Sequence, residues 1–120
     1  EGRLFVKRGI EKCFEMYQKH DWESVSEKVS SLNQFVKKNR VFARKFISGA
    51  TQLELDTVGR INLPNGLLDY AGVEKELVLF AYGNKIEIWD KVAYDAELGM
   101  SDNDFAGLAE EVMGDINLGE

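Results

Sequence analysis

The chain has 120 residues, of which 44% are hydrophobic and 11% aromatic, so it can bury the core of one compact domain or of two small halves that share a core. Its single cysteine, Cys13, excludes a disulfide framework within the chain, and its longest apolar run, Leu77 to Tyr82, is too short to cross a bilayer. Residues 1–60 carry 12 basic and 8 acidic side chains whereas residues 61–120 carry 3 and 13, so the overall acidity does not exclude a nucleic-acid partner, which responds to local charge.

The first 49 residues predict a hairpin followed by two helices. Apolar residues favour strands over Arg3–Lys7 and Cys13–Tyr17, joined by a turn. Asp21 is placed to cap one helix and Asn33 to cap the next, which Gly49 ends. Apolar residues recur at helical spacing, as Trp22, Val25, Val29 and Leu32 in the first helix and as Phe35, Val36, Phe42, Ala43, Phe46 and Ile47 in the second.

The other side of the second helix is basic. Lys37, Arg40 and Arg44, which we call the basic stripe, recur at spacings of three and four and therefore share one face. Such a stripe is most often a solvated helix face, and we favour that interpretation. The alternatives are that it contacts DNA phosphates beside a main reading loop, or that it pairs with acids of a neighbouring subunit.

The next stretch predicts a strand, a turn and a short helix. Gln52–Asp56 alternates as strands do, Thr57-Val58-Gly59 turns the chain, and Arg60–Leu63 continues extended. Pro64 suits the first turn of a helix, because its missing N–H costs nothing there, and Gly72 ends that helix.

A second hairpin and a helix follow. Glu76–Ala81 and Lys85–Trp89 predict strands about a tight turn, and Val92–Leu98 predicts a helix. We expect the core to come from the strands at Leu53–Leu55, Ile61–Leu63, Leu77–Phe80 and Ile86–Trp89.

The acidic segment from residue 99 to 120 predicts a last helix, capped by Ser101 or Asp102. Its apolar positions are Phe105, Leu108, Ala109, Val112 and Met113. We expect this helix to dock on its own or a neighbouring subunit, or to stay frayed. A less favoured hypothesis is that its acids compete with DNA for the basic surface.

Two stretches of the chain match when one is shifted by 72 positions. The matches are Phe14–Lys19 with Ile86–Lys91, Trp22 with Tyr94, and Phe5-Val6 with Leu77-Val78. Any two hairpin–helix units agree to some degree, but the matched aromatic and lysine positions favour duplication of one unit. We then expect the second copy to begin with the strand at Leu53 and the first to lack its opening strand and turn.

Three runs in the second half follow one another in a specific order. Leu55–Pro64 contains Asp-x-x-x-Arg followed by Leu-Pro, Leu68–Val73 contains Tyr-Ala-Gly, and Gly83–Asp90 contains Asn-x-x-Glu-x-Trp. Together they resemble the motifs in the second half of proteins of the MraZ family. The first half agrees more loosely, through Arg8-Gly9, the Cys13–Tyr17 strand and Trp22, so the resemblance covers about residues 1–98.

Two departures from the family pattern stand out. The first Asp-x-x-x-Arg motif is missing, as we expect if residues that precede Glu1 are absent from this sequence. Thr57 and Val58 stand where the family often has a lysine in the second motif.

The resemblance implies an α+β fold of two fused AbrB-like swapped-hairpin β units that form a small pseudo-two-fold barrel with flanking helices. Residues 1–48 would be the remainder of the first unit, residues 49–98 the second unit, and residues 99–120 an acidic tail. It also implies a bacterial DNA-binding transcriptional regulator, cytoplasmic and nucleoid-associated. Such a protein assembles as a homo-oligomeric ring on direct repeats of double-stranded promoter DNA, upstream of the division and cell-wall gene cluster. We expect no cofactor, metal, membrane or small-molecule substrate.

The Asp56–Arg60 loop is the predicted DNA contact. Gly59 permits a positive φ angle, and Arg60 can fork onto a phosphate or onto a guanine edge. Asp56 can hold Arg60 or accept from the loop amides, Thr57 can donate to a phosphate, and Val58 helps to shape the loop. Spacing alone equally favours an internal Asp–Arg pair that pins the turn, and only the surrounding motifs put DNA ahead.

Two other classes of function remain open. A ring-forming scaffold would use the same loops to bind a protein and not DNA. A thiol enzyme would pair Cys13 with His20, but a cysteine in an apolar strand is usually a small buried hydrophobe, and His20 is expected to be exposed. One histidine and one cysteine cannot supply the usual zinc ligands. An enzyme is the least favoured class.

Overall fold

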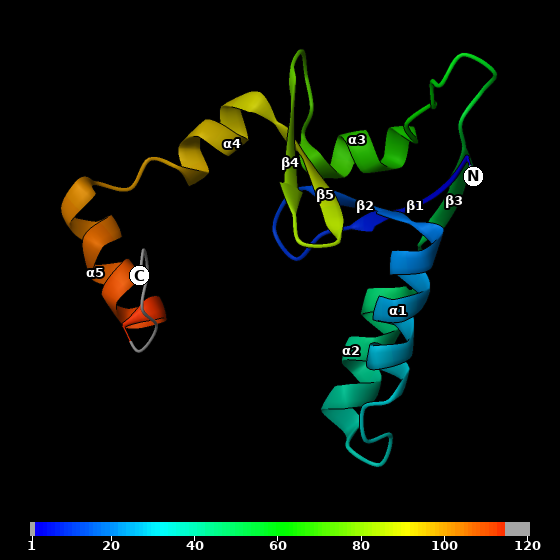
Figure 1. The fold of residues 1–120 in the computed structure, drawn as a ribbon, viewed down its shortest axis with the longest axis horizontal. Coiled ribbons are helices and arrows are strands. Elements are labelled where there is room, and N and C mark those ends of the chain that lie inside the picture. The colour runs from blue at the N-terminus through cyan, green and yellow to red at the C-terminus, as the bar shows by residue number, and fades with distance from the viewer. Residues whose placement is uncertain (1, 115–120) are drawn as a thin grey trace.

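The computed structural model describes residues 2–114, which fold into one five-stranded sheet with five helices around it (Figure 1). The elements are β1 (Arg3–Arg8), β2 (Phe14–Gln18), α1 (Lys19–Ser30), α2 (Lys37–Ile47), β3 (Thr51–Glu54), α3 (Asn65–Ala71), β4 (Leu77–Tyr82), β5 (Lys85–Asp90), α4 (Lys91–Glu97) and α5 (Asp102–Met113). The strand order is β3-β1-β2-β5-β4, and all neighbouring strands are antiparallel. The predicted α+β class is confirmed.

A local two-fold relation runs through the middle of the sheet. Strands β2 and β5 pair with Glu15 opposite Glu87, and on either side of this pair Phe14 faces Ile88 and Met16 faces Ile86. The 72-residue shift matches these same residues, so exchanging the two halves leaves the register unchanged. The helices that follow repeat an i,i+4 ion pair as well, Lys19–Glu23 in α1 and Lys91–Asp95 in α4. The pairing supports the duplication predicted from the sequence.

The outer strands depart from that relation by one residue. Phe5 faces Tyr17, whereas Trp89 is faced by Val78 and not by Leu77, so the predicted match of Phe5-Val6 with Leu77-Val78 is wrong by one position. The connections explain the slip. Five residues join β1 to β2 and two join β4 to β5, and connections of odd and even length cannot leave the same register.

Strand β3 belongs to the predicted second unit, residues 49–98, but pairs with a strand of the first. It pairs with β1, with Leu53 opposite Leu4, and forms one edge of the sheet. The predicted strand Gln52–Asp56 is therefore present, although it ends at Glu54. Ile61–Leu63 was also expected to be a strand, but within residues 2–114 it pairs with no strand of the sheet. Strands from both halves share one sheet.

The core lies where α3 covers this sheet. Val6, Phe14 and Ile88 come from three adjacent strands and pack with Leu67 and Ala71 of α3. The half-buried side chains packed against this cluster are Met16, Leu53, Leu63, Leu68 and Val73. Burial of these side chains supplies the main driving force for joining the two halves.

Strand β4 corrects one core prediction. We expected Leu77–Phe80 in the core, but Leu77, Leu79 and Phe80 are exposed, Leu79 to 64%. The reason is position, because α3 packs on β1 and β2, whereas β4 is the last strand of the sheet and lies away from that cover.

Two predicted helix caps are wrong. Helix α1 begins two residues before Asp21, because β2 runs directly into it, and Gln18 at its N-cap makes no side-chain cap bond. Asp21 lies instead in the first turn, where the helix dipole favours an acid. Asn33 Oδ1 accepts from the Phe35 amide at 3.0 Å, in a turn that precedes α2 and leaves the Phe35 side chain 96% exposed.

Other helix ends agree with the sequence more closely. Helix α2 ends at Ile47, near Gly49, and Gly72 ends α3 with a φ angle of 68°, which a glycine adopts without strain. Pro64 is the residue before α3 and not within its first turn. Of the two predicted caps for α5, the correct one is Ser101, whose hydroxyl accepts from the Asp104 amide at 3.1 Å.

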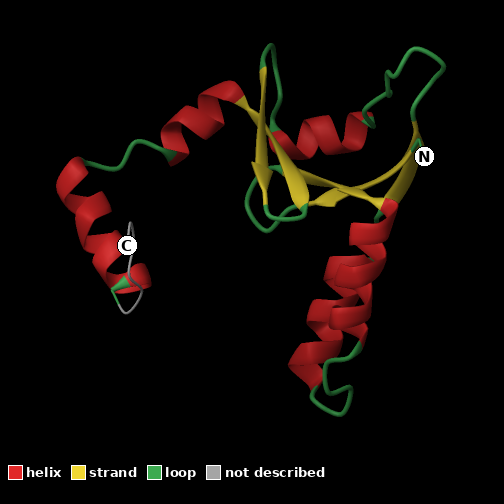
Figure 2. Cartoon of the chain, in the orientation of Figure 1, coloured by secondary structure: helices red, strands yellow, loops and turns green. Residues whose placement is uncertain are grey.

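Two helical arms leave the sheet on different sides, α1–α2 on one and α4–α5 on the other (Figure 2). The radius of gyration is 16.9 Å, whereas a compact chain of this length has about 14 Å. The α1–α2 arm is anchored by Trp22, which stacks on Phe5 and on Phe46 and also meets Tyr17. Helix α5 buries none of its residues. Every helix between residues 2 and 114 is too short or too polar to span a membrane.

Candidate nucleic-acid interface

The Asp56–Arg60 loop joins β3 to α3 and projects beyond the sheet, on the side away from the α1–α2 arm (Figure 1). Strand β3 ends the sheet at one edge, and the Leu55 amide donates to the Gly2 carbonyl at 2.8 Å, which holds the base of the loop. The Asp56 amide then donates to the Arg60 carbonyl at 2.8 Å and closes the loop on itself. The tip is solvent-exposed from Thr57 to Gly59.

Asp56 organises this loop from inside. Its Oδ1 accepts from the amides of Val58, at 2.9 Å, and Arg60, at 2.8 Å. Its Oδ2 accepts from Nε of the Arg60 guanidinium at 3.1 Å. The Gly59 amide donates to the Asp56 carbonyl at 3.1 Å, and Gly59 has a φ angle of 85°, in the region that favours glycine. One carboxylate therefore fixes both the backbone of the turn and one edge of the guanidinium.

These bonds change the electrostatics of the carboxyl group. The pKa of Asp56 lies below its usual value, chiefly because the Arg60 amide donates to the ionised form, with the Val58 amide and the Arg60 guanidinium adding to it. The carboxylate stays charged at neutral pH, so the loop keeps its internal anchor.

The Arg60 side chain is paired and exposed at once. It is 78% exposed, and within residues 2–114 its only side-chain hydrogen bond runs from Nε to Asp56, which leaves both Nη groups without a hydrogen-bond partner there. The two interpretations of the motif do not exclude one another here. The Asp–Arg pair pins the turn, and the same pair holds a guanidinium fork pointing outward. A fork held at one edge loses less side-chain entropy when it meets a planar acceptor.

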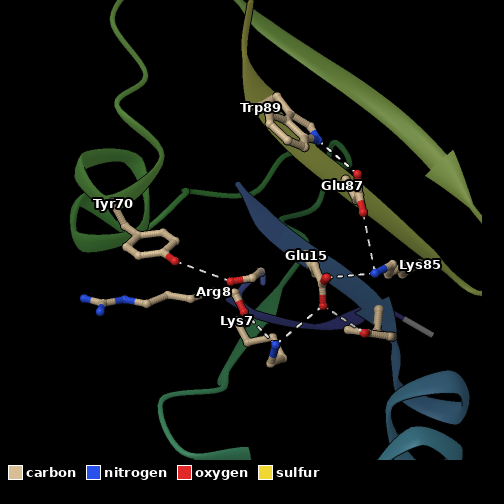
Figure 3. Close-up of polar contacts among 9 residues, drawn as sticks. Lys7, Arg8, Glu15, Tyr70, Lys85, Glu87 and Trp89 are labelled. Carbon is tan, nitrogen blue, oxygen red and sulfur yellow. Dashed lines mark hydrogen bonds and ion pairs between the residues drawn. The ribbon is translucent and has the colours of Figure 1, made fainter. Parts of the chain in front are cut away.

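Helix α3 ties this loop to the other half of the chain. Tyr70 donates from its hydroxyl to the Gly9 carbonyl at 3.4 Å, and the Arg8 guanidinium lies 4.7 Å from the centroid of its ring (Figure 3). The Lys12 ammonium lies 4.9 Å from the same centroid. Ala71 is buried in the core and Gly72 turns the chain. The Tyr-Ala-Gly run thus has a structural role, which is to seat α3 behind the loop.

The basic stripe is not brought to the loop. Lys37, Arg40 and Arg44 lie exposed on α2, in the arm that leaves the sheet away from the β3–α3 connection (Figure 1). Arg40 Nη1 donates to the Gln34 carbonyl at 2.8 Å, which fixes that side chain against the turn before α2. The predicted phosphate contact beside the main loop gains no support from this placement.

A buried charge network, which the sequence analysis did not predict, lies at the centre of the sheet (Figure 3). Glu15 accepts from Lys85 at 2.8 Å and from the Tyr17 hydroxyl at 3.0 Å, and it lies 3.5 Å from the Lys7 ammonium. Across the two-fold, Glu87 accepts from the Trp89 indole at 3.0 Å and lies 3.5 Å from Lys85. The signal in the sequence was an acid two residues before an aromatic in each matched strand.

The lysines of this network respond differently to burial. Burial lowers the pKa of Lys7, and the nearby Glu15 opposes this only in part. Burial also works against the charge of Lys85, but its hydrogen bond and attraction to Glu15 outweigh this and raise its pKa. Each group already has partners inside the sheet, so we assign the network to stability and not to binding.

Cys13 and His20 do not meet. Cys13 is fully buried and His20 is exposed, as predicted, and β2, about 16 Å long, separates them. Burial and the neighbouring acids Glu87 and Glu15 raise the pKa of the Cys13 thiol to about 12, so it stays protonated at neutral pH and is a poor nucleophile. Among residues 2–114, no group of three or more potential ligands could hold a metal ion.

The chain is similar to known proteins over most of its length. Residues 46–114 match the family model described as "MraZ protein, putative antitoxin-like". A relative from Flavobacterium psychrophilum, named Transcriptional regulator MraZ, is 42% identical over 117 residues, which cover 98% of this chain and 74% of the relative. A relative of the same name from Christiangramia forsetii is 44% identical over 110 residues, 91% of this chain and 71% of its own length.

Proposed function

The chain belongs to the MraZ family, as its sequence motifs predicted, and from this membership we propose that it is a transcriptional regulator that binds double-stranded DNA. Its targets would be direct repeats in the promoter upstream of the division and cell-wall gene cluster, and it would act in the cytoplasm, at the nucleoid. It would have no enzymatic activity. The names of both relatives support the regulatory role.

We assign DNA contact to the Asp56–Arg60 loop. The observation that carries this assignment is the Arg60 guanidinium, which is exposed to 78% while Asp56 holds its Nε. The two free Nη groups match a phosphate or the acceptor edge of a guanine. Thr57 would donate to a phosphate, and Val58 and Gly59 would shape the approach of the backbone.

One guanidinium gives weak binding, so we propose that the protein acts as a homo-oligomeric ring. Several identical loops that engage successive repeats gain affinity without a new type of contact. The extended shape and the exposed apolar side chains of β4 and α5 support assembly, because a monomer in solution rarely leaves so much apolar surface uncovered.

We further propose that the fold is a pair of swapped-hairpin units, with residues 1–48 and 49–98 as the two units and residues 99–120 as a tail. Two features support this: the register of β2 and β5 is two-fold symmetric, and β3 pairs with the hairpin of the other unit. A closed pseudo-barrel would need cover over β4 as well.

The test is binding of the full chain to promoter DNA from upstream of its own gene, measured by gel shift over a range of salt concentrations. We expect affinity to fall steeply with salt, and Arg60→Ala to weaken binding about 10- to 100-fold and to reduce the preference over scrambled DNA. Arg60→Lys keeps the charge without the fork, so it should retain salt-dependent binding but not the preference.

Lys75→Ala is the matched control, because it removes one exposed positive charge elsewhere in the second half. If Lys75→Ala and Arg60→Ala weaken binding equally, the loop is not the reader. If the chain binds no DNA at any salt concentration but still assembles, the scaffold alternative replaces this proposal. Arg44→Ala tests the weaker prediction that the basic stripe also meets phosphates.

A further inference from the structure

Helix α5 carries an apolar stripe that nothing covers within residues 2–114. Phe105, Leu108 and Val112 recur at spacings of three and four and are 63%, 41% and 64% exposed. Four acids and no base accompany them: Asp102, Asp104, Glu110 and Glu111. The helix therefore presents a narrow apolar face together with acidic side chains.

The α1–α2 arm carries the complementary surface. A groove of about 230 Å³ lies between the two helices, and its lining includes the apolar side chains of Val29, Leu32 and Ala43 and the basic side chains of Arg40 and Arg44. Helix α2 contains five bases and no acid. Arg40 donates to the carbonyl of Gln34, which also lines the groove, so the Arg40 side chain is held in place.

The two surfaces also match in length. Helix α5 has 12 residues and α2 has 11, so each is about 17 Å long. An amphipathic helix laid in an apolar groove between two helices is a common mode of recognition. Here opposite charges on the two surfaces would set its orientation.

The groove of the same chain is a poor destination for α5. Helix α4 begins directly at the end of β5, where Asp90 caps it by accepting from the Ala93 amide, and only Leu98 to Ser101 separate it from α5. The two arms leave the sheet on different sides (Figure 1). The α4–α5 arm, which carries these acids, therefore points away from the α1–α2 arm of its own subunit (Figure 1).

We propose that α5 of one subunit docks in the α1–α2 groove of a second copy of the chain, with its acids facing the basic stripe. The contact is head-to-tail, and a head-to-tail contact repeated by rotation closes into a ring. The inference rests on the proposed ring and specifies its joint. The basic stripe then serves assembly and not DNA.

The test is the molar mass of the full chain, measured by size exclusion with multi-angle light scattering at several protein concentrations. We expect the wild type to be a multiple of 13.6 kDa. Arg40→Glu with Arg44→Glu, and separately Glu110→Lys with Glu111→Lys, should each reduce the mass to that of one subunit. An equimolar mixture of the two double variants should restore the assembly, because each reversed surface then meets its complement.

Leu108→Ser with Val112→Ser tests the apolar part of the contact in the same way, and thermal unfolding checks that each variant folds. A monomeric wild type, masses unchanged by the reversals, or no rescue on mixing overturns the inference. So does loss of DNA affinity in the Arg40/Arg44 variant with its mass unchanged, since phosphates would then be the partner of the stripe. Arg60→Ala should leave the mass unaltered, so failure of the DNA proposal is seen separately.

Discussion

The β2–α1 and β5–α4 segments carry the same arrangement of side chains on either side of the two-fold relation, but their surroundings differ. In the first, α2 adds Phe46 to the Trp22 cluster and Lys7 faces Glu15. In the second, α5 follows α4 as α2 follows α1 but buries none of its residues, and Phe80 faces Glu87 where a lysine faces Glu15.

The difference shows how one pattern serves two purposes. In the first segment, Tyr17 and Trp22 are buried within the subunit. In the second, Trp89 is buried, but Tyr94 is only half-buried and the β4 side chains Leu77, Leu79 and Phe80 are exposed, and the chain after α4 leads into the outward arm (Figure 2). Duplication therefore supplies one half that stabilises the subunit and another half with apolar surface available for neighbours.

The largest expected effect is a loss of stability when the Trp22 cluster of the first segment is disrupted. Trp22→Ala removes a ring that meets Phe5, Tyr17 and Phe46, and we expect a loss of about 4 kcal/mol in the free energy of unfolding. The matched substitution, Tyr94→Ala, removes a half-buried ring and should cost about 1 kcal/mol. Urea unfolding followed by circular dichroism at one protein concentration measures both. Equal losses would contradict the unequal cover of the two halves.

A smaller difference in unfolding free energy is expected between substitutions of the two buried acids, Glu15 and Glu87. Glu15→Gln leaves Lys7 and Lys85 in the sheet without their carboxylate, and we expect a cost of about 3 kcal/mol in unfolding free energy. Glu87→Gln should cost about 1 kcal/mol, because the polar partners of Glu87 within residues 2–114 are Lys85 and the Trp89 indole. The same urea titrations compare them. A larger loss of unfolding free energy for Glu87→Gln than for Glu15→Gln would contradict the assignment of Glu15 as the central acid of the network.

Local patterns in the sequence predicted much of the fold. The two hairpins, Gly72 after α3, Ser101 before α5 and the Asp56–Arg60 pair each depend on residues a few positions apart, so composition and spacing specify them. The buried thiol of Cys13 followed from its apolar neighbours in the same way.

The remaining features depend on partners far along the chain. No local signal indicates that β3 pairs with β1, and the same crossover decides that β4 is left at the edge with Leu79 exposed. The cap at Asp21 was wrong because β2 passes into α1 without a break, which the tertiary path of the strand sets. For the loop, spacing could not decide between a pinned pair and an exposed one, since that depends on where β3 lies.

The smallest effect concerns the Asp56–Arg60 loop, which belongs to the second half and is held by hydrogen bonds and not by packing. Because the pKa of Asp56 is lowered on folding, the order it gives the loop is fully present above the usual aspartate pKa and is lost as pH falls through the lower folded value. We expect the amide resonances of Val58 and Arg60 to move together in that acidic range, followed by NMR, while the core signal of Trp22 stays unchanged. Asp56→Asn keeps an acceptor oxygen but cannot titrate, so its two amides should show no such step. Movement of Trp22 at the same pH would mean that the whole sheet, and not the loop alone, responds to the proton.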